Sequence, residues 1–302
     1  MSAVQSLSAV QGLSAFPITP SGPDGRVDVA ALRRIVAPLA DAGVDSIGLL
    51  GSTGSYPYLT RGERRRALDA ALDAAGGRVP ILVGVGALRT DEALRLAEDA
   101  RAAGAAAGLL APVSYTPLTE GEVFEHFAAV ARAGLPLCIY DNPSTTHFAF
   151  TPELVGRVAR LDGVVALKSL APPPEAMAAH LGALRAAGPA GLSIGYSVDW
   201  HAADALLAGA DAWYGVAAGL FPARCLAILR AARAGDAAEA RRLDAAMRPL
   251  WDLFKAHSSL RVAYAAAEAL GICSAEPPRP LLPLPRALRD RVAEVVRGLG
   301  PA

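Results

Sequence analysis

The sequence alternates short apolar stretches with longer segments of helical spacing, and it does so eight times. Each apolar stretch is four to seven residues long and is bounded by glycine, proline or polar residues, which is typical of a strand buried on both faces of a parallel sheet. The expected strands are 13–19, 46–50, 80–84, 107–111, 136–140, 164–170, 192–195 and 212–215.

Eight strand–helix units of similar length favour a closed (β/α)₈ TIM barrel of the α/β class. A doubly wound open sheet usually has fewer strands, and it would need a dinucleotide fingerprint. The pair Gly84 and Gly86 lacks the third glycine of that fingerprint. We expect the barrel over residues 1–234 and a helical extension packed on it over residues 235–302, with helices at 236–270 and 284–299 and a proline-rich link at 277–285.

Several residues predict the N-termini of helices. Threonine followed three residues later by glutamate predicts capping boxes at Thr60 and Thr119. Thr90 is expected to cap the helix that ends near residue 104. Thr151 followed by proline predicts an N-cap with proline at the first helical position.

Composition and charge exclude several classes of protein. The 302 residues carry a net charge of +0, so electrostatics suggests neither a nucleic-acid nor a membrane partner. Three distant cysteines without a C-x-x-C pair argue against a disulfide framework and for a reducing, cytoplasmic location. Residues 1–15 lack a basic leader, the segment before residue 13 is expected to be frayed, and no apolar run is long enough to span a bilayer.

The sequence contains neither a pattern of metal ligands nor the motif of a serine hydrolase. The five histidines are scattered and form no ligand cluster with carboxylates, so we expect no metal and no other cofactor. A nucleophilic serine of the G-x-S-x-G type is absent as well.

Lysine usage points to one position. Lys168 and Lys255 are the only lysines, and the other 27 of the 29 basic residues are arginine, which cannot act as an amine nucleophile. Lys255 has a helical context typical of a surface residue, whereas Lys168 ends the apolar run 164–168. Burial disfavours the ammonium form and frees an amine that can attack a ketone to form a Schiff base. A structural ion pair is the competing interpretation of Lys168.

Other candidates fall at the same end of the expected barrel, where active sites of this fold lie. Tyr140 ends the strand before that of Lys168 and could relay protons as general acid and base, or it could be a core aromatic. Ser52 and Thr53 lie in a Gly-Ser-Thr-Gly turn whose hydroxyls and N–H groups could hold a carboxylate, or the turn could be an ordinary loop. Trp213 and Tyr214 either line the pocket or pack the barrel floor.

Four motifs together resemble the dihydrodipicolinate synthase/N-acetylneuraminate lyase family. They are Gly51-Ser52-Thr53-Gly54, Tyr140-Asp141-Asn142-Pro143-Ser144, Ala166-Leu167-Lys168 and Gly195, in order and in spacing from about Phe16 to the C-terminal helices. The resemblance implies a pyruvate-type Schiff base on Lys168, proton relay by Tyr140, binding of a 2-oxo acid carboxylate by Ser52 and Thr53, a substrate-binding Gly195, and a homo-oligomer, either tetramer or dimer.

The sequence departs from the synthase pattern where the second substrate binds. Thr145 stands where the synthase carries an arginine for aspartate semialdehyde, and Ser55 replaces a common glutamate. Val113 and Ser114 replace a tyrosine pair, with Tyr115 displaced by one position. We therefore expect Thr145 to contact the substrate, and His147 either to contact it too or to be a plain loop residue.

The function expected from these features is that of a class I lyase or aldolase. It would form an imine between Lys168 and a 2-oxo acid and make or cleave a carbon–carbon bond, without being the lysine-pathway synthase. A dehydratase or hydratase-aldolase could use the same imine. A catalytically silent barrel that binds a 2-oxo acid is the alternative from a different class.

Overall fold

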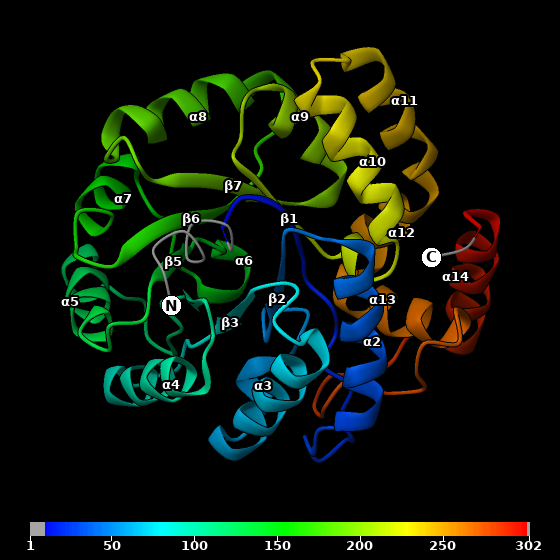
Figure 1. Ribbon diagram of the computed structural model, residues 1–302, viewed down its shortest axis with the longest axis horizontal. Helices are drawn as coiled ribbons and strands as arrows, with labels where there is room; N and C mark the ends of the chain where they lie inside the picture. The colour runs from blue at the N-terminus through cyan, green and yellow to red at the C-terminus, as the bar shows by residue number, and fades with distance from the viewer. Residues whose placement is uncertain (1–9, 301–302) are drawn as a thin grey trace.

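The eight expected strands form a closed parallel barrel. The structure is a computed structural model that describes residues 10–300, so residues 1–9, most of the segment expected to be frayed, lie outside the described residues. Each strand pairs with the next in the sequence, and β8 pairs with β1. Figure 1 shows the strands at the centre with the helices around them. The strands are β1 (Gly12–Ala15), β2 (Ser46–Leu49), β3 (Ile81–Gly84), β4 (Ala107–Leu110), β5 (Leu137–Tyr140), β6 (Val164–Leu170), β7 (Ser193–Ser197) and β8 (Ala212–Gly215).

Helices surround the strands and continue past the last one. The α-helices are α2 (Val29–Ala42), α3 (Arg61–Ala75), α4 (Thr90–Ala103), α5 (Glu120–Ala131), α6 (Pro143–Thr146), α7 (Pro152–Val158), α8 (Pro174–Ala187), α9 (Ala202–Leu207), α10 (Pro222–Arg233), α11 (Ala237–Ala246), α12 (Arg248–His257), α13 (Ser259–Ala269) and α14 (Arg286–Gly298). Short 3₁₀ helices are η1 (Tyr56–Tyr58), η2 (Asp199–His201) and η3 (Ala217–Gly219).

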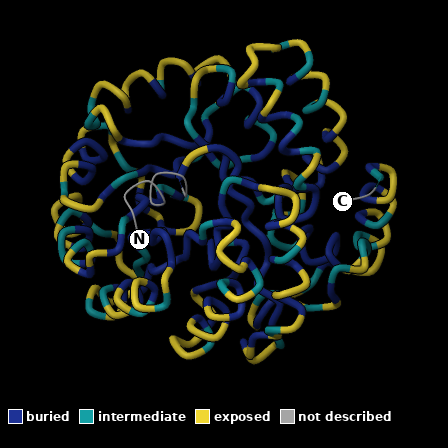
Figure 2. Tube along the Cα trace, in the orientation of Figure 1, coloured by how far each residue is buried: buried dark blue, intermediate teal, exposed yellow. Residues whose placement is uncertain are grey.

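Burial follows the sequence pattern. The strands are buried almost throughout, while most of the outer helices combine buried and exposed positions along their length (Figure 2). One buried cluster fills the barrel interior, and it includes Leu109, Cys138, Tyr140, Ala166 and Tyr214. Because side chains two apart share a face of a strand, Lys168 points inward like Ala166. The (β/α)₈ fold is thus confirmed, and it turns the ends of the strands toward one mouth.

Some of the predicted helix N-caps are present in the structure and others are not. Thr119 and Glu122 form the expected capping box, and Thr151 caps α7. Thr60 accepts from the Glu63 N–H, but the carboxylate of Glu63 accepts from the Val27 N–H instead of closing the box. The prediction for Thr90 was wrong, because its Oγ1 lies 2.9 Å from Nδ1 of His126 and makes no cap.

Two elements differ from their expected bounds by more than two residues. β1 ends at Ala15 because the chain leaves the sheet there, and the Phe16 ring packs so closely against Gly48 that a Cβ on this glycine would lie 2.2 Å from it. The segment expected as one helix, 236–270, is three helices. The first break, between α11 and α12, falls just before Pro249, because proline has no N–H to continue the helix. The second break, between α12 and α13, falls at Ser258, whose φ of 70° is left-handed.

The C-terminal helices pack on the side of the barrel that carries α2 and α10 (Figure 1). Tyr264 of α13 donates a hydrogen bond of 3.0 Å to the carbonyl of Thr19, just after β1. This contact ties α13 to the barrel mouth.

Two further features concern membrane-spanning helices and the cysteines. Over residues 10–300, no helix has the length and apolar character needed to cross a membrane. Cys138, Cys225 and Cys273 are free and buried.

Candidate active site

Lys168 lies inside the barrel mouth with only 4% of its surface exposed. On β6 it is in register with Tyr140 of β5 on one side and with Gly195 of β7 on the other. Its Nζ lies 3.9 Å from the centre of the Tyr140 ring and 5.2 Å from that of Phe16. No carboxylate among residues 10–300 lies within 4.0 Å of this amine, so the structure offers no support for a structural ion pair.

The hydroxyl of Tyr140 is held by two polar side chains. Nδ2 of Asn142 donates to it at 2.8 Å, and Oγ of Ser52 lies 3.0 Å away. The amide of Asn142 is itself oriented, because Ser144 Oγ donates to its Oδ1 at 2.7 Å. These contacts fix the position of the phenol oxygen, and a hydroxyl held within hydrogen-bond reach of its partners can give up and take back a proton. The arrangement therefore suits reversible proton transfer.

The Gly-Ser-Thr-Gly turn follows β2 and faces the same space. Ser52 is half-buried and Thr53 is buried. Gly51 is required here because a Cβ would lie 2.7 Å from the Phe16 ring, the same ring that faces Lys168. The turn thus keeps two hydroxyls close to the buried amine.

A cavity of about 550 Å³ joins these groups. Five of the residues expected from the sequence line it: Ser52, Thr53, Tyr140, Thr145 and Lys168. This volume falls in the range usual for small-molecule sites and is larger than a three-carbon acid requires. The lining also includes residues that sequence reasoning missed, namely Phe16, Tyr56, Asn142, Asp199, Trp200 and Arg261.

Two expected site residues are not brought to the cavity. His147 is exposed, and it ends α6 in the left-handed region with a φ of 57°. Gly195 is buried beside Lys168, but a Cβ there would lie 2.6 Å from both Ala212 and Tyr214. The structure therefore gives Gly195 a packing role inside the barrel.

Asp199 is a buried carboxyl group at the β7 side of the mouth. Its Oδ1 accepts from Nε1 of Trp213 at 2.9 Å, and its Oδ2 accepts from the Val216 N–H at 3.2 Å. Burial raises its pKa to about 6, and these hydrogen bonds limit the rise. Asp199 thus links the segment after β7 to the end of β8. Of the two aromatic residues of β8, Tyr214 lines the cavity and Trp213 does not, because successive side chains of a strand point to opposite faces.

Tyr56 and Arg64 form a stacked pair next to the Gly-Ser-Thr-Gly turn. The guanidinium of Arg64 lies 5.0 Å from the centre of the Tyr56 ring, and its Nη1 donates to the Gly86 carbonyl at 2.8 Å. Burial raises the pKa of Tyr56 and lowers that of Arg64. Tyr56 lines the cavity, whereas Arg64 does not line it and packs against the Tyr56 ring.

The signals that could have revealed the missed residues differ. Asn142 lies in the Tyr140 motif itself, directly after a strand end. Asp199 lies in the short 3₁₀ helix η2 and Arg261 in the C-terminal helix α13, where the sequence carries no local mark of a site. Across the described residues, no group of three or more His, Cys, Asp or Glu side chains is placed to hold a metal ion.

Comparison with known proteins gives a consistent result. The Dihydrodipicolinate synthetase family matches residues 9–298. The 4-hydroxy-tetrahydrodipicolinate synthase of Methylococcus capsulatus is 33% identical over 293 residues, which covers 96% of this chain and 99% of that protein.

Solved structures agree. A dihydrodipicolinate synthase from Agrobacterium tumefaciens superimposes with a TM-score of 0.95 at 54% identity, covering 98% of this chain and 100% of the other. A putative dihydrodipicolinate synthetase from Pseudomonas aeruginosa gives a TM-score of 0.89 at 31% identity, covering 96% and 99%. The resemblance seen in the motifs is confirmed, and this chain belongs to the dihydrodipicolinate synthetase family of class I, pyruvate-dependent, aldolase-type lyases.

Proposed function

We propose that Lys168 forms a Schiff base with a pyruvate-type 2-oxo acid, and that the enzyme makes or cleaves a carbon–carbon bond at C3 of that acid. One observation carries the assignment: Lys168 is buried at the end of a barrel strand, lines a cavity and has no carboxylate within 4.0 Å among residues 10–300. An amine that faces a cavity and has no carboxylate beside it is placed to attack a ketone carbonyl and form an imine.

The 2-oxo acid carboxylate is assigned to the turn that carries Ser52 and Thr53. Both side chains line the cavity, and their hydroxyls offer donors that need no competing charge. This placement would leave the C2 carbonyl facing the amine of Lys168. Thr145, on the short helix α6 after β5, would contact the part of the substrate beyond C3.

Tyr140 is assigned the proton transfers. The amine adds to C2, the carbonyl oxygen takes up two protons and leaves as water, and an imine remains. Loss of a proton from C3 then gives the enamine, whose C3 attacks an aldehyde carbon while the aldehyde oxygen takes a proton. The phenol of Tyr140, held by Asn142 and Ser52, is suited to accept and return these protons.

We also propose a homo-oligomer, a dimer or tetramer. Tyr115 and Leu88 are exposed large side chains, at 97% and 66%. A surface hollow between the loops after β3 and β4 includes Leu88, Val113 and Leu118. Exposed apolar surface of this kind is typical of association sites.

We also propose how the chain is divided into domains and where the protein is located. Residues 1–234 would form the catalytic barrel, and residues 235–302 a helical extension held on it by contacts such as that of Tyr264 with Thr19. Three free, buried cysteines support a cytoplasmic location.

The proposal is tested by hydrogen exchange of pyruvate in D₂O, followed by proton NMR. Enamine formation on Lys168 exchanges the methyl protons, so the wild-type enzyme should remove the methyl signal. The variant Lys168→Arg keeps the positive charge but cannot form an imine, and it should give only the uncatalysed rate. Equal exchange by this variant, or no exchange by the wild type, would contradict the proposal.

A further inference from the structure

Arg261 is a half-buried arginine that lines the same cavity as Lys168. It lies in the first turn of α13, and no acidic residue lies in that turn. No carboxylate of residues 10–300 comes within 4.0 Å of its guanidinium, although many of the other arginines in that range have such a partner. A cation in this position, without a protein counter-ion, is available to an anionic ligand.

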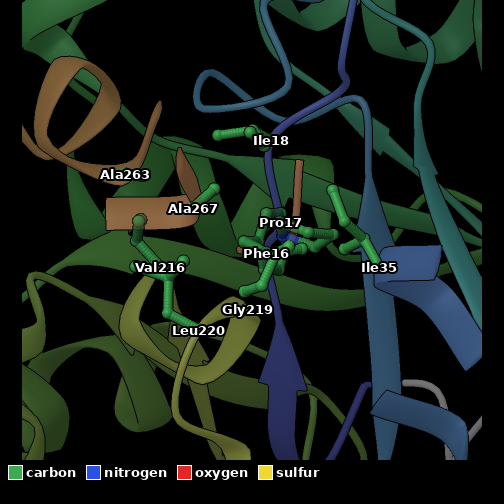
Figure 3. A pocket seen from close by; sticks show the side chains of 10 residues that line it. Phe16, Pro17, Ile18, Ile35, Val216, Gly219, Leu220, Ala263 and Ala267 are labelled. Atoms are coloured by element: carbon green, nitrogen blue, oxygen red, sulfur yellow. The ribbon is translucent and has the colours of Figure 1, made fainter. Parts of the chain in front are cut away.

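The helix that carries Arg261 is fixed to the barrel mouth. The Tyr264 hydroxyl donates to the Thr19 carbonyl at 3.0 Å. In Figure 3, Ala263 and Ala267 of α13 lie on one side of the segment Phe16–Ile18, and Ile35 of α2 lies on the other. Phe16 is the residue whose ring centre lies 5.2 Å from Nζ of Lys168. Arg261 is therefore presented by a packed helix that is linked through one side chain to the reactive lysine.

The basic side chains that line the cavity outnumber the acidic ones. Among the described residues, the basic side chains that line the cavity are Lys168 and Arg261, and the acidic one is Asp199. Both oxygens of Asp199 already accept hydrogen bonds, from Trp213 and Val216. Lys168 is consumed by the imine, and the Ser52–Thr53 turn is assigned to the first carboxylate. Arg261 is left for a second negative group on the substrate.

The rest of the lining supports a carboxylate as that group. The cavity of about 550 Å³ exceeds what a three-carbon acid needs, so a longer substrate can fit. Thr145, on the short helix α6, carries no charge, and its Oγ1 donates to the Asn142 carbonyl at 3.2 Å. A single guanidinium matches the two oxygens of one carboxylate.

We propose that Arg261 binds the distal carboxylate of the substrate, and that the enzyme therefore acts on 2-oxo acids with a second carboxylate. This inference rests on the proposed function, because it takes the imine on Lys168 as given. Arg261 then determines the substrate class without taking part in the covalent steps.

The test compares 2-oxo acids that differ only in their far end. 2-Oxoglutarate is paired with 2-oxopentanoate, and 2-oxoadipate with 2-oxohexanoate, so that a methyl group replaces the carboxylate in each pair. Each acid is trapped on the enzyme with borohydride, and the half-saturating concentration is read from the adduct measured by mass spectrometry. The wild type should trap the dicarboxylate of at least one pair at a concentration about 10- to 100-fold lower than its partner, the range expected for one charge-assisted hydrogen-bonded pair.

Arg261→Gln should bring that ratio close to one, and Arg261→Lys should restore part of it. Arg248→Gln removes an equal charge from exposed surface on α12 and should leave the ratio as in the wild type. A general structural defect would weaken both members of a pair and leave their ratio unchanged, which would refute the assignment. Equal trapping of both members by the wild type would refute it as well. Failure of the wild type to trap pyruvate would instead refute the imine itself.

Discussion

The amine of Lys168 lies 3.9 Å from the centre of the Tyr140 ring, on the neighbouring strand and in register with it. The phenol is held from its other side by Asn142 and Ser52. A covalent nucleophile and a proton carrier therefore occupy adjacent strand ends of one rigid barrel. The geometry separates their tasks, since the amine binds the substrate and the phenol moves protons.

Tyr140→Phe removes the hydroxyl and keeps the ring that packs against Lys168. Because general acid–base assistance contributes about 10²- to 10⁴-fold, exchange of the pyruvate methyl protons in D₂O should slow by that factor. The melting temperature should change little, and borohydride trapping on Lys168 should persist at a lower rate. Tyr58→Phe is the matched control, because Tyr58 lies at the cavity rim and is 42% exposed. Exchange at the wild-type rate in Tyr140→Phe would remove this residue from the mechanism.

Tyr115 tests whether a second tyrosine takes part. Its side chain is 97% exposed within the chain and does not line the cavity. Tyr115→Phe should therefore exchange pyruvate protons within about twofold of the wild type, since general acid–base groups contribute far more than that. A loss comparable to that of Tyr140→Phe, measured by the same NMR assay, would show that Tyr115 reaches the site of another subunit.

The second substrate should not be aspartate semialdehyde. Thr145, on the short helix α6, stands where the synthase pattern has an arginine for this carboxylate, and a threonine cannot form the bidentate pair. Loss of a charge-assisted hydrogen bond costs about 1.5–3 kcal/mol. Condensation of pyruvate with this aldehyde by the purified enzyme should be weak or absent in a product assay. Efficient turnover of this pair would contradict the prediction.

Asp199 should give the protein a distinct pH dependence of stability. Its pKa is raised by burial from 3.8 to about 6, so the folded state binds its proton more tightly than the unfolded state does. The contribution of Asp199 is therefore most favourable below pH 4, falls as the pH rises to 6, and stays at its lower value above that. The total change is about 3 kcal/mol, from 1.36 kcal/mol per pKa unit.

The measurement is the free energy of unfolding from pH 4 to pH 7 for the wild type and Asp199→Asn. The difference between them isolates Asp199 from other groups such as Asp244, whose pKa is also raised to about 6 by burial. Stability of the wild type relative to the variant should fall across pH 4–6. A relative stability that rises over this range would contradict the assignment.

Much of this architecture could be predicted from the sequence, because apolar runs and their spacing determine the strand order. Lys168, Tyr140 and Ser52 could be assigned to one mouth because parallel strands of a barrel all end on the same side. Lys168 was ambiguous because the sequence does not show whether a carboxylate lies beside it.

Other features needed three-dimensional structure. Ser258 adopts a left-handed φ of 70° without the glycine that would signal it, so the break between α12 and α13 had no sequence mark. Arg261 reaches the cavity only because α13 folds back on the segment after β1, a contact between residues 245 positions apart. His147 was expected near the substrate on chain position alone, and its left-handed turn leaves it exposed.

The central claim is the imine on Lys168, and the most direct measurement is borohydride reduction in the presence of pyruvate, followed by peptide mapping with mass spectrometry. The peptide that contains Lys168 should gain the mass of the reduced pyruvate adduct, and the peptide with Lys255 should not. Lys168→Ala should gain no mass, whereas Lys255→Arg should behave as the wild type. An adduct on Lys255, or no adduct on the wild type, would contradict the account.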